Sequence, residues 1–122
     1  MVKLIFLLKR KDGMSFEDFV EYYETRHQLI GCRVMPGCVK YQRRFLRYLG
    51  QTIAGAHPDD RYDVITELWF PDQATLDSAM AFAQRPDNAA IIAADEENFF
   101  DRSRIKAYVV DSERDSDLSV EA

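Results

Sequence analysis

Residues 2–9 read Val-Lys-Leu-Ile-Phe-Leu-Leu-Lys, and this stretch decides which folds the chain can adopt. Its five central residues are all apolar, so a β-strand through it has hydrophobic side chains on both faces. A strand of this kind lies in the middle of a sheet that is covered on both sides. The chain must therefore provide a cover for each face of this strand.

A helix is predicted soon after this strand, between Ser15 and Gly31. Ser15 is a favoured N-cap residue, Asp18 completes a capping-box pattern three positions later, and Gly31 is a suitable C-cap. Six residues follow at helical spacing and share an arc of about 100°: Phe16, Phe19, Val20, Tyr23, His27 and Ile30. Because His27 lies within this arc, the helix directs an imidazole toward whatever it packs against.

The remaining segments complete the order strand, helix, strand, strand, helix, strand. Further strands are predicted at residues 39–49, 62–70 and 104–111, a second helix from Pro71-Asp72 to Pro86-Asp87, and a third helical piece at 88–97. This order predicts an α+β, ferredoxin-like βαββαβ fold with a four-stranded antiparallel sheet. Its first and third strands are central, which agrees with the apolar stretches at 2–9 and 62–70.

The two central strands predict a homodimer. Two helices cover only one face of the sheet, so the apolar side chains on the other face would form an exposed patch in a monomer. We expect two copies to pack sheet against sheet, which leaves the pocket of each subunit on its helix-covered face. Glu67 lies in the apolar strand at 62–70 and needs a partner when buried, for which Arg43 or Arg44 is expected.

Composition bounds the function further. The chain has 122 residues, of which 47% are hydrophobic and 30% charged, as expected for one globular domain. We place this domain at 1–110 and predict an acidic disordered tail at 111–122. The tail has five acidic residues and one arginine, so it carries a charge of −4 out of the net charge of −5 of the chain. The nearly neutral body argues against nucleic acid as a partner.

Several function classes lack their sequence signals. The apolar run at residues 4–8 is too short for a membrane span or a signal peptide, so we expect a cytoplasmic protein with no membrane partner. Cys32 and Cys38 are spaced as in no zinc or redox motif, and His27 and His57 form no metal-binding pattern. No glycine-rich phosphate or dinucleotide fingerprint occurs, so no metal or cofactor is predicted.

Four stretches together resemble the EthD family of the dimeric α/β-barrel group. They are residues 2–10 with 13–19, Tyr-Tyr-Glu-Thr-Arg-His at 22–27, Asp63–Phe70, and the stretch Asp95–Arg104. That group includes small aromatic polyketide cyclases, anthraquinone-pathway dehydratases and methylmuconolactone isomerase. The resemblance implies a homodimeric barrel with a cofactor-free pocket in each subunit, and it implies acid–base chemistry at His27.

Residues 36–41, Pro-Gly-Cys-Val-Lys-Tyr, are similar to the muconolactone isomerase in particular. That match implies that Tyr41 lines the pocket and that His57, in the long loop at 50–61, approaches it. The isomerase has a catalytic cysteine in its third strand where this chain has Leu68. The same lactone isomerisation, which needs the thiol, is therefore not implied.

The candidate site combines these residues. The candidate catalytic residues are His27, Tyr41 and Asp101, and the candidate substrate-binding residues are Tyr23, His57, Leu68 and Phe99. An imidazole titrates near neutrality and can take and return a proton, a phenol can stabilise a developing enolate, and the carboxylate of Asp101 can orient His27 or the substrate. Most of these residues also have a purely structural interpretation. His27 would be a core histidine, Tyr41 an edge-strand residue, Tyr23 and Phe99 core aromatics, His57 a solvated loop residue, and Asp101 part of a surface ion pair.

The predicted function is a cofactor-independent cyclase, dehydratase, isomerase or carbon–carbon lyase that acts on an aromatic, polyketide-like or lactone small molecule. Two alternatives remain open at this point. One is a non-catalytic small-molecule-binding or stress-response protein with the same pocket. The other is a monooxygenase of the same barrel group, which would consume oxygen.

Overall fold

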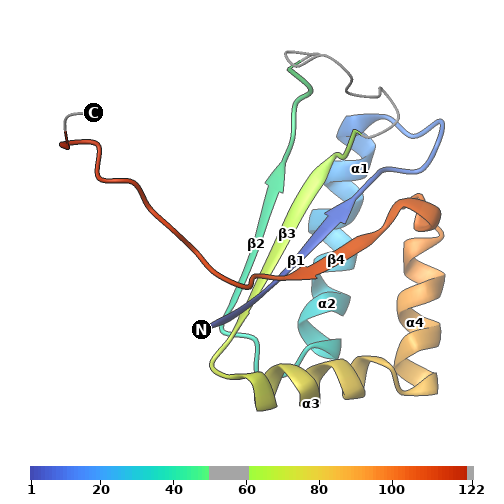
Figure 1. The fold of residues 1–122 in the computed structure, drawn as a ribbon. Coiled ribbons are helices and arrows are strands. Elements are labelled where there is room, and N and C mark those ends of the chain that lie inside the picture. Colours follow the sequence, from blue (N-terminus) through green and yellow to red (C-terminus); the bar gives the residue numbers. More distant parts are fainter. Residues whose placement is uncertain (50–60, 121–122) are drawn as a thin grey trace.

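The computed structural model describes residues 1–49 and 61–120 and contains one four-stranded antiparallel sheet in the order β2-β3-β1-β4. Its strands are β1 (Val2–Leu8), β2 (Lys40–Phe45), β3 (Val64–Phe70) and β4 (Lys106–Val109). The helices lie on one side of this sheet (Figure 1). They are α1 (Phe16–Tyr22), a π-helical turn (Tyr23–His27), α2 (Gln28–Val34), α3 (Gln73–Ala83), α4 (Pro86–Glu96) and a 3₁₀ turn (Arg102–Arg104).

The predicted ferredoxin-like α+β fold is confirmed, with β1 and β3 in the centre of the sheet. Leu4 pairs with Leu68 and Leu8 with Val64, and all four side chains are buried beneath the helices. The buried side chains form two clusters. One is centred on Leu4, Leu68 and Phe70 with α2 and α3, and the other on Leu8, Val64 and the aromatic residues of α1 and residues 99–100.

The first helix begins as predicted but ends later. The Ser15 hydroxyl accepts a hydrogen bond from the Asp18 N–H at 3.1 Å, which confirms the N-cap. The prediction that Gly31 caps the C-terminus is wrong, because α2 continues to Val34. The chain turns at Gly37 instead, whose φ of +88° is a conformation that favours glycine.

Other element boundaries move by a few residues. Pro86 begins α4 as its first residue, a position where the missing N–H of proline costs nothing. Strands β2 and β4 are shorter than the predicted 39–49 and 104–111. Residues 111–120 contain no helix or strand and extend away from the sheet (Figure 1). The division into a domain at 1–110 and a disordered tail at 111–122 stays a prediction.

The second face of the sheet carries no helix and displays alternate residues of the central strands. The predicted partner of Glu67 is present, since Arg44 Nη1 lies 3.5 Å from its Oε2. Trp69 lies on the same face, between the ammonium groups of Lys3 and Lys40, which are 4.1 and 4.2 Å from its ring centroid. Its indole N–H is buried without a hydrogen-bond partner in the described part of the chain.

Candidate active site

A π-helical turn between α1 and α2 places Tyr23 and His27. The N–H of Gln28 donates to the carbonyl of Tyr23, five residues back, so this turn is wider than an α-helical one. Two side chains donate to backbone carbonyls of this segment: the Thr25 hydroxyl to Glu21 O at 2.7 Å and the Gln28 amide to Glu24 O at 3.1 Å. Such turns occur often at functional sites, because they change the direction in which side chains leave a helix.

A buried carboxylate orients the imidazole of His27. His27 Nδ1 lies 2.6 Å from Oδ2 of Asp95, which comes from the last turn of α4. The other oxygen of Asp95 accepts a hydrogen bond from the Tyr22 hydroxyl at 2.8 Å, and Asn98 donates to that hydroxyl at 2.8 Å. Because the carboxylate accepts at both oxygens, the hydrogen of neutral His27 resides on Nδ1. Nε2 is then left with a free lone pair.

The surroundings of His27 favour its neutral form. Its ring lies 4.9 to 5.1 Å from the ring centroids of Tyr23, Phe99 and Phe100. Burial lowers the pKa of His27 below its ordinary value of 6.5, although the hydrogen bond and charge of Asp95 oppose this effect. His27 is therefore an unprotonated base at neutral pH.

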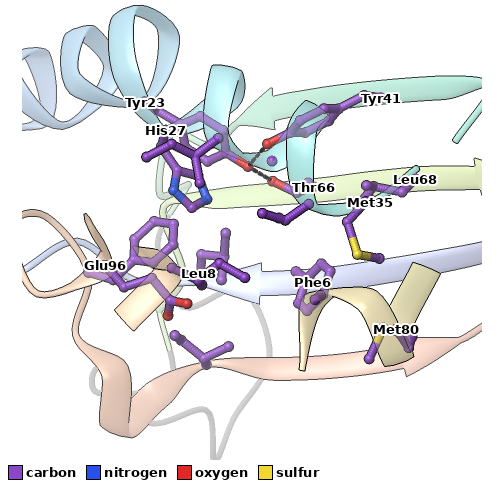
Figure 2. Close-up of a pocket in the computed structure, with 17 residues that line it drawn as sticks. Phe6, Leu8, Tyr23, His27, Met35, Tyr41, Thr66, Leu68, Met80 and Glu96 are labelled. Carbon is purple, nitrogen blue, oxygen red and sulfur yellow. Dashed lines mark hydrogen bonds between the residues drawn. The ribbon is translucent and has the colours of Figure 1, made fainter. Parts of the chain in front are cut away.

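A chain of hydroxyl groups forms a second polar part of the site. The Tyr23 hydroxyl lies 2.5 Å from Thr66 Oγ1 and 3.1 Å from the Tyr41 hydroxyl (Figure 2). If Thr66 donates to Tyr23 and Tyr23 donates to Tyr41, each tyrosine oxygen accepts one hydrogen and the Tyr41 hydrogen is free for a ligand. Burial raises the pKa of both tyrosines, so they remain phenols and can donate.

The absence of a side chain at Gly31 makes room for Tyr41. A Cβ atom at this position would lie 2.9 Å from the Tyr41 hydroxyl oxygen and 3.0 Å from Cε2. Gly31 is inside α2, where glycine costs about 0.5–1 kcal/mol relative to alanine. Close approach of the phenol to the helix backbone accounts for a glycine at this point.

These residues line a cavity of about 190 Å³ between the helices and the sheet. Most of its wall is aliphatic or aromatic, with residues from both buried clusters, and the polar groups are those of Tyr23, His27, Tyr41, Thr66 and Glu96 (Figure 2). A dry protein cavity of about 150 Å³ can hold benzene. The cavity is therefore large enough for a molecule with about one ring.

The structure brings together only some of the residues predicted to form the site. His27, Tyr23, Tyr41 and Leu68 all line the cavity. Phe99 is completely buried and packs against His27 outside the cavity wall, where Phe100 takes its place.

The two remaining predicted site residues are Asp101 and His57. The prediction that Asp101 orients His27 is wrong: its Oδ1 accepts from the N–H and hydroxyl of Ser103 at 3.1 and 2.6 Å, so it caps the 3₁₀ turn. Asp95 has the orienting role instead. His57 lies outside the described residues, and its predicted approach to the pocket stays a prediction.

Sequence reasoning missed two carboxylates, Asp95 and Glu96. Asp95 lies three positions after Ile92 of the cavity wall, so a carboxylate on the inner face of a predicted helix was the available signal. Burial raises the pKa of Glu96, with smaller contributions in the same direction from Asp95 and Glu97, while Arg102 opposes them. Besides the phenols of Tyr23 and Tyr41, the cavity wall thus contains the imidazole of His27 and the carboxyl of Glu96.

The described part of the chain gives no metal or membrane signal. Among residues 1–49 and 61–120, no three histidine, cysteine or acidic side chains gather as a metal site would require. No helix within the same ranges has the length and apolar character needed to cross a membrane.

Comparison with known proteins assigns the family. Residues 11–103, well over half of the chain, match the family model described as the EthD domain. The chain belongs to the EthD family. No curated protein matches it in sequence.

Solved structures agree with this EthD assignment in their fold. An ethyl tert-butyl ether D (EthD) family protein from Bacillus halodurans has a TM-score of 0.62 and 18% identity, with 93% of this chain and 99% of that chain covered. At3g17210 from Arabidopsis thaliana has a TM-score of 0.62 and 17% identity, with coverages of 95% and 99%. A dimeric ferredoxin-like protein of unknown function from Thermobifida fusca has a TM-score of 0.57 and 19% identity, with coverages of 89% and 88%.

Proposed function

We propose that this EthD protein is a cofactor-independent acid–base enzyme that acts on a small aromatic, polyketide-like or lactone molecule. The observation that carries the proposal is the His27–Asp95 pair, in which Asp95 holds Nδ1 while His27 lines a mostly apolar cavity. An oriented base in an apolar site is suited to removing a proton from carbon. The reaction class is cyclisation, dehydration, isomerisation or carbon–carbon cleavage.

His27 and Tyr41 have different roles in the proposed reaction. His27 Nε2 accepts a proton from a carbon next to a carbonyl, or from a phenol, and the electron pair moves into an enolate or phenolate. The Tyr41 hydroxyl donates a hydrogen bond to the oxygen that gains charge, with Tyr23 and Thr66 holding it in place. The imidazolium, stabilised by Asp95, then returns its proton. A positioned general base contributes a rate factor of about 10²–10⁴.

The lining of the cavity suits a mostly apolar ligand. Leu8, Leu68, Met80 and Phe100 supply apolar contact, while the polar groups are few and separated. This is the usual composition of a small-molecule site, in which apolar side chains provide affinity and a few polar groups fix orientation. Leu68 supplies no thiol, so the proposed chemistry depends on proton transfer alone.

We also propose that the enzyme is a homodimer formed by the helix-free face of the sheet. Ile65 and Trp69 are only partly buried on that face, and an apolar sheet face is normally covered in a folded protein. The dimeric state described for the Thermobifida fusca protein supports a dimer here. A cytoplasmic location remains a proposal from the sequence.

Hydrogen–deuterium exchange of a simple ketone tests the proposed chemistry without knowledge of the natural substrate. 4-Hydroxyacetophenone has one ring and acidic hydrogens next to its carbonyl, and ¹H NMR in D₂O measures their loss. Wild type should accelerate exchange, and His27→Gln should lose about 10²-fold or more of that acceleration. Asp101→Asn is the matched control and should exchange like wild type. Equal exchange by wild type and His27→Gln would exclude His27 as the base and favour a binding protein.

A further inference from the structure

Glu96 is a carboxyl group of the cavity wall that has no part in the proton transfer proposed for His27. It lies at the end of α4, next to Asp95 in sequence, and its side chain is only 16% exposed. Figure 2 shows its carboxylate directed into the space below the His27 imidazole, with Leu8 beside them. An ionisable group in such an apolar wall needs a reason to be there, because burying its charge is unfavourable.

The ion pair with Arg102 is too long to account for the burial of Glu96. Arg102 Nε lies 3.8 Å from its Oε2, which is beyond hydrogen-bond distance. The short contact of the same guanidinium, at 3.0 Å, is to Oε1 of Glu97, which is well exposed. Arg102 is itself 46% exposed, so solvent weakens its effect. The direct structural role of Arg102 is thus with Glu97.

We propose that Glu96 is the proton donor that works opposite His27, so that the site removes a proton from one atom of the bound molecule and delivers another to a second atom. This inference rests on the proposed function and deepens it. Burial raises the pKa of Glu96, and the neighbouring carboxylates of Asp95 and Glu97 act in the same direction against Arg102. A protonated carboxyl is the form that can donate.

The two residues together extend the chemistry of the site. A single imidazole returns its proton only to atoms within reach of Nε2, whereas two groups serve atoms on two sides of a ring-sized ligand. The natural substrate then carries an acidic C–H on the His27 side and an oxygen that gains a proton on the Glu96 side. After turnover His27 is protonated and Glu96 ionised, and transfer of that proton within the cavity restores both groups.

Ring opening of 1,2-benzisoxazoles tests both roles with one reaction. The base takes the proton from C3, the electrons of that C–H bond complete a nitrile, and the N–O bond breaks. The electron pair stays on oxygen, which takes the proton of the acid and becomes a 2-hydroxybenzonitrile. Acid assistance matters for the parent compound, but little for the 5-nitro compound, whose leaving phenolate is much less basic.

Glu96→Gln keeps the shape of the side chain and removes its proton, and Asp87→Asn, in the exposed first turn of the same helix, is the control. We expect Glu96→Gln to slow the parent compound by about 10–100-fold and the 5-nitro compound by less than about threefold. Asp87→Asn should resemble wild type with both compounds. Equal effects of Glu96→Gln on the two compounds, or no effect on either, would overturn the role of Glu96.

A His27→Gln variant separates this inference from the proposed function. Loss of both reactions in His27→Gln, together with unequal effects in Glu96→Gln, supports both assignments. If His27→Gln loses both reactions but Glu96→Gln treats the compounds alike, only the Glu96 inference fails. If wild type opens neither ring, or His27→Gln matches wild type, the proposed function itself fails, and the Glu96 inference with it.

Should Glu96→Gln not fold, a titration of the wild-type protein still decides the matter. Among the described residues, Glu96 faces His27 across the cavity, and the charges of Arg102, Asp95 and Glu97 act on it. The ¹³C shift of the Glu96 carboxyl should report a pKa above its ordinary value of 4.5. A carboxyl that titrates at or below the ordinary value would contradict its role as a donor.

Discussion

Replacing Asp95 by asparagine should remove the base function of His27 while leaving the volume of the site unchanged. In the native protein the Asp95 carboxylate accepts from both His27 Nδ1 and the Tyr22 hydroxyl. An asparagine has one acceptor and one donor end, so it cannot serve both partners in the same way. If its NH₂ group faces His27, Nδ1 must become the acceptor, and the hydrogen moves to Nε2. The cavity then meets an N–H instead of a lone pair.

The size of the effect follows from the contact that is lost. A hydrogen bond to a charged group contributes about 1.5–3 kcal/mol. Its loss should lower the pKa of His27 further, because the hydrogen bond and charge of Asp95 are the influences that raise it. At a fixed pH, the ratio of imidazolium to imidazole should fall by about 10–100-fold. Ketone exchange should fall by about 10²-fold, since the tautomer presented to the substrate is wrong.

Long-range ¹H–¹⁵N NMR of the histidine side chains measures the tautomer directly. Wild type should show His27 with hydrogen on Nδ1, and Asp95→Asn should show hydrogen on Nε2 together with slower exchange of 4-hydroxyacetophenone. Asp101→Asn, which changes the other carboxylate considered from the sequence, should do neither. An Asp95→Asn protein with the native tautomer and native exchange rate would refute the orienting role of Asp95.

Substitutions of Gly31, His27 and Ile65 provide three further tests. In Gly31→Ala the new methyl group should displace Tyr41, so ketone exchange should slow. Thermal stability should not fall, because alanine is better than glycine by about 0.5–1 kcal/mol inside a helix. Unchanged exchange kinetics would contradict the close fit of Tyr41 against Gly31. The folded-state pKa of His27 is lowered, so the stability that it contributes is present above its unfolded value of 6.5 and is lost as the pH falls through the lowered pKa. On acidification, the melting temperature of His27→Gln should therefore fall less than that of wild type. Parallel curves of melting temperature against pH for the two proteins would contradict this. Ile65→Glu places a carboxylate on the helix-free face of the sheet, beside its cross-strand neighbour Arg44. This variant should fold but sediment as a monomer. A dimer like that of wild type would show that the helix-free face is not the interface.

The strand order and the position of His27 were predictable because they depend on hydrophobic pattern. Residues 2–9 and 62–70 are apolar on both faces, and only central strands of a two-sided sheet tolerate that. His27 shares an apolar arc with Tyr23, so the helix had to bury it. These conclusions need the identity of residues and their spacing, but no three-dimensional detail.

The π-helical turn and the partner of His27 were not predictable in this way. One extra residue in a turn leaves the apolar residues of a single helix on nearly the same arc, so periodicity does not reveal it. Asp95 and Asp101 lie in one short stretch, and the carboxylate that reaches His27 depends on where α4 ends. Asp95 precedes that end and points inward, whereas Asp101 follows the buried pair Phe99–Phe100 and caps a turn.

A crystal structure with 4-hydroxyacetophenone bound tests the central claim most directly, namely that the cavity holds a small aromatic ketone against the free nitrogen of His27. The account predicts the ligand inside the cavity, with the carbon next to its carbonyl facing His27 Nε2 and the carbonyl oxygen within hydrogen-bond distance of the Tyr41 hydroxyl. A saturated crystal with the ligand absent from the cavity, or with Nε2 hydrogen-bonded to a group of the protein itself, would contradict it.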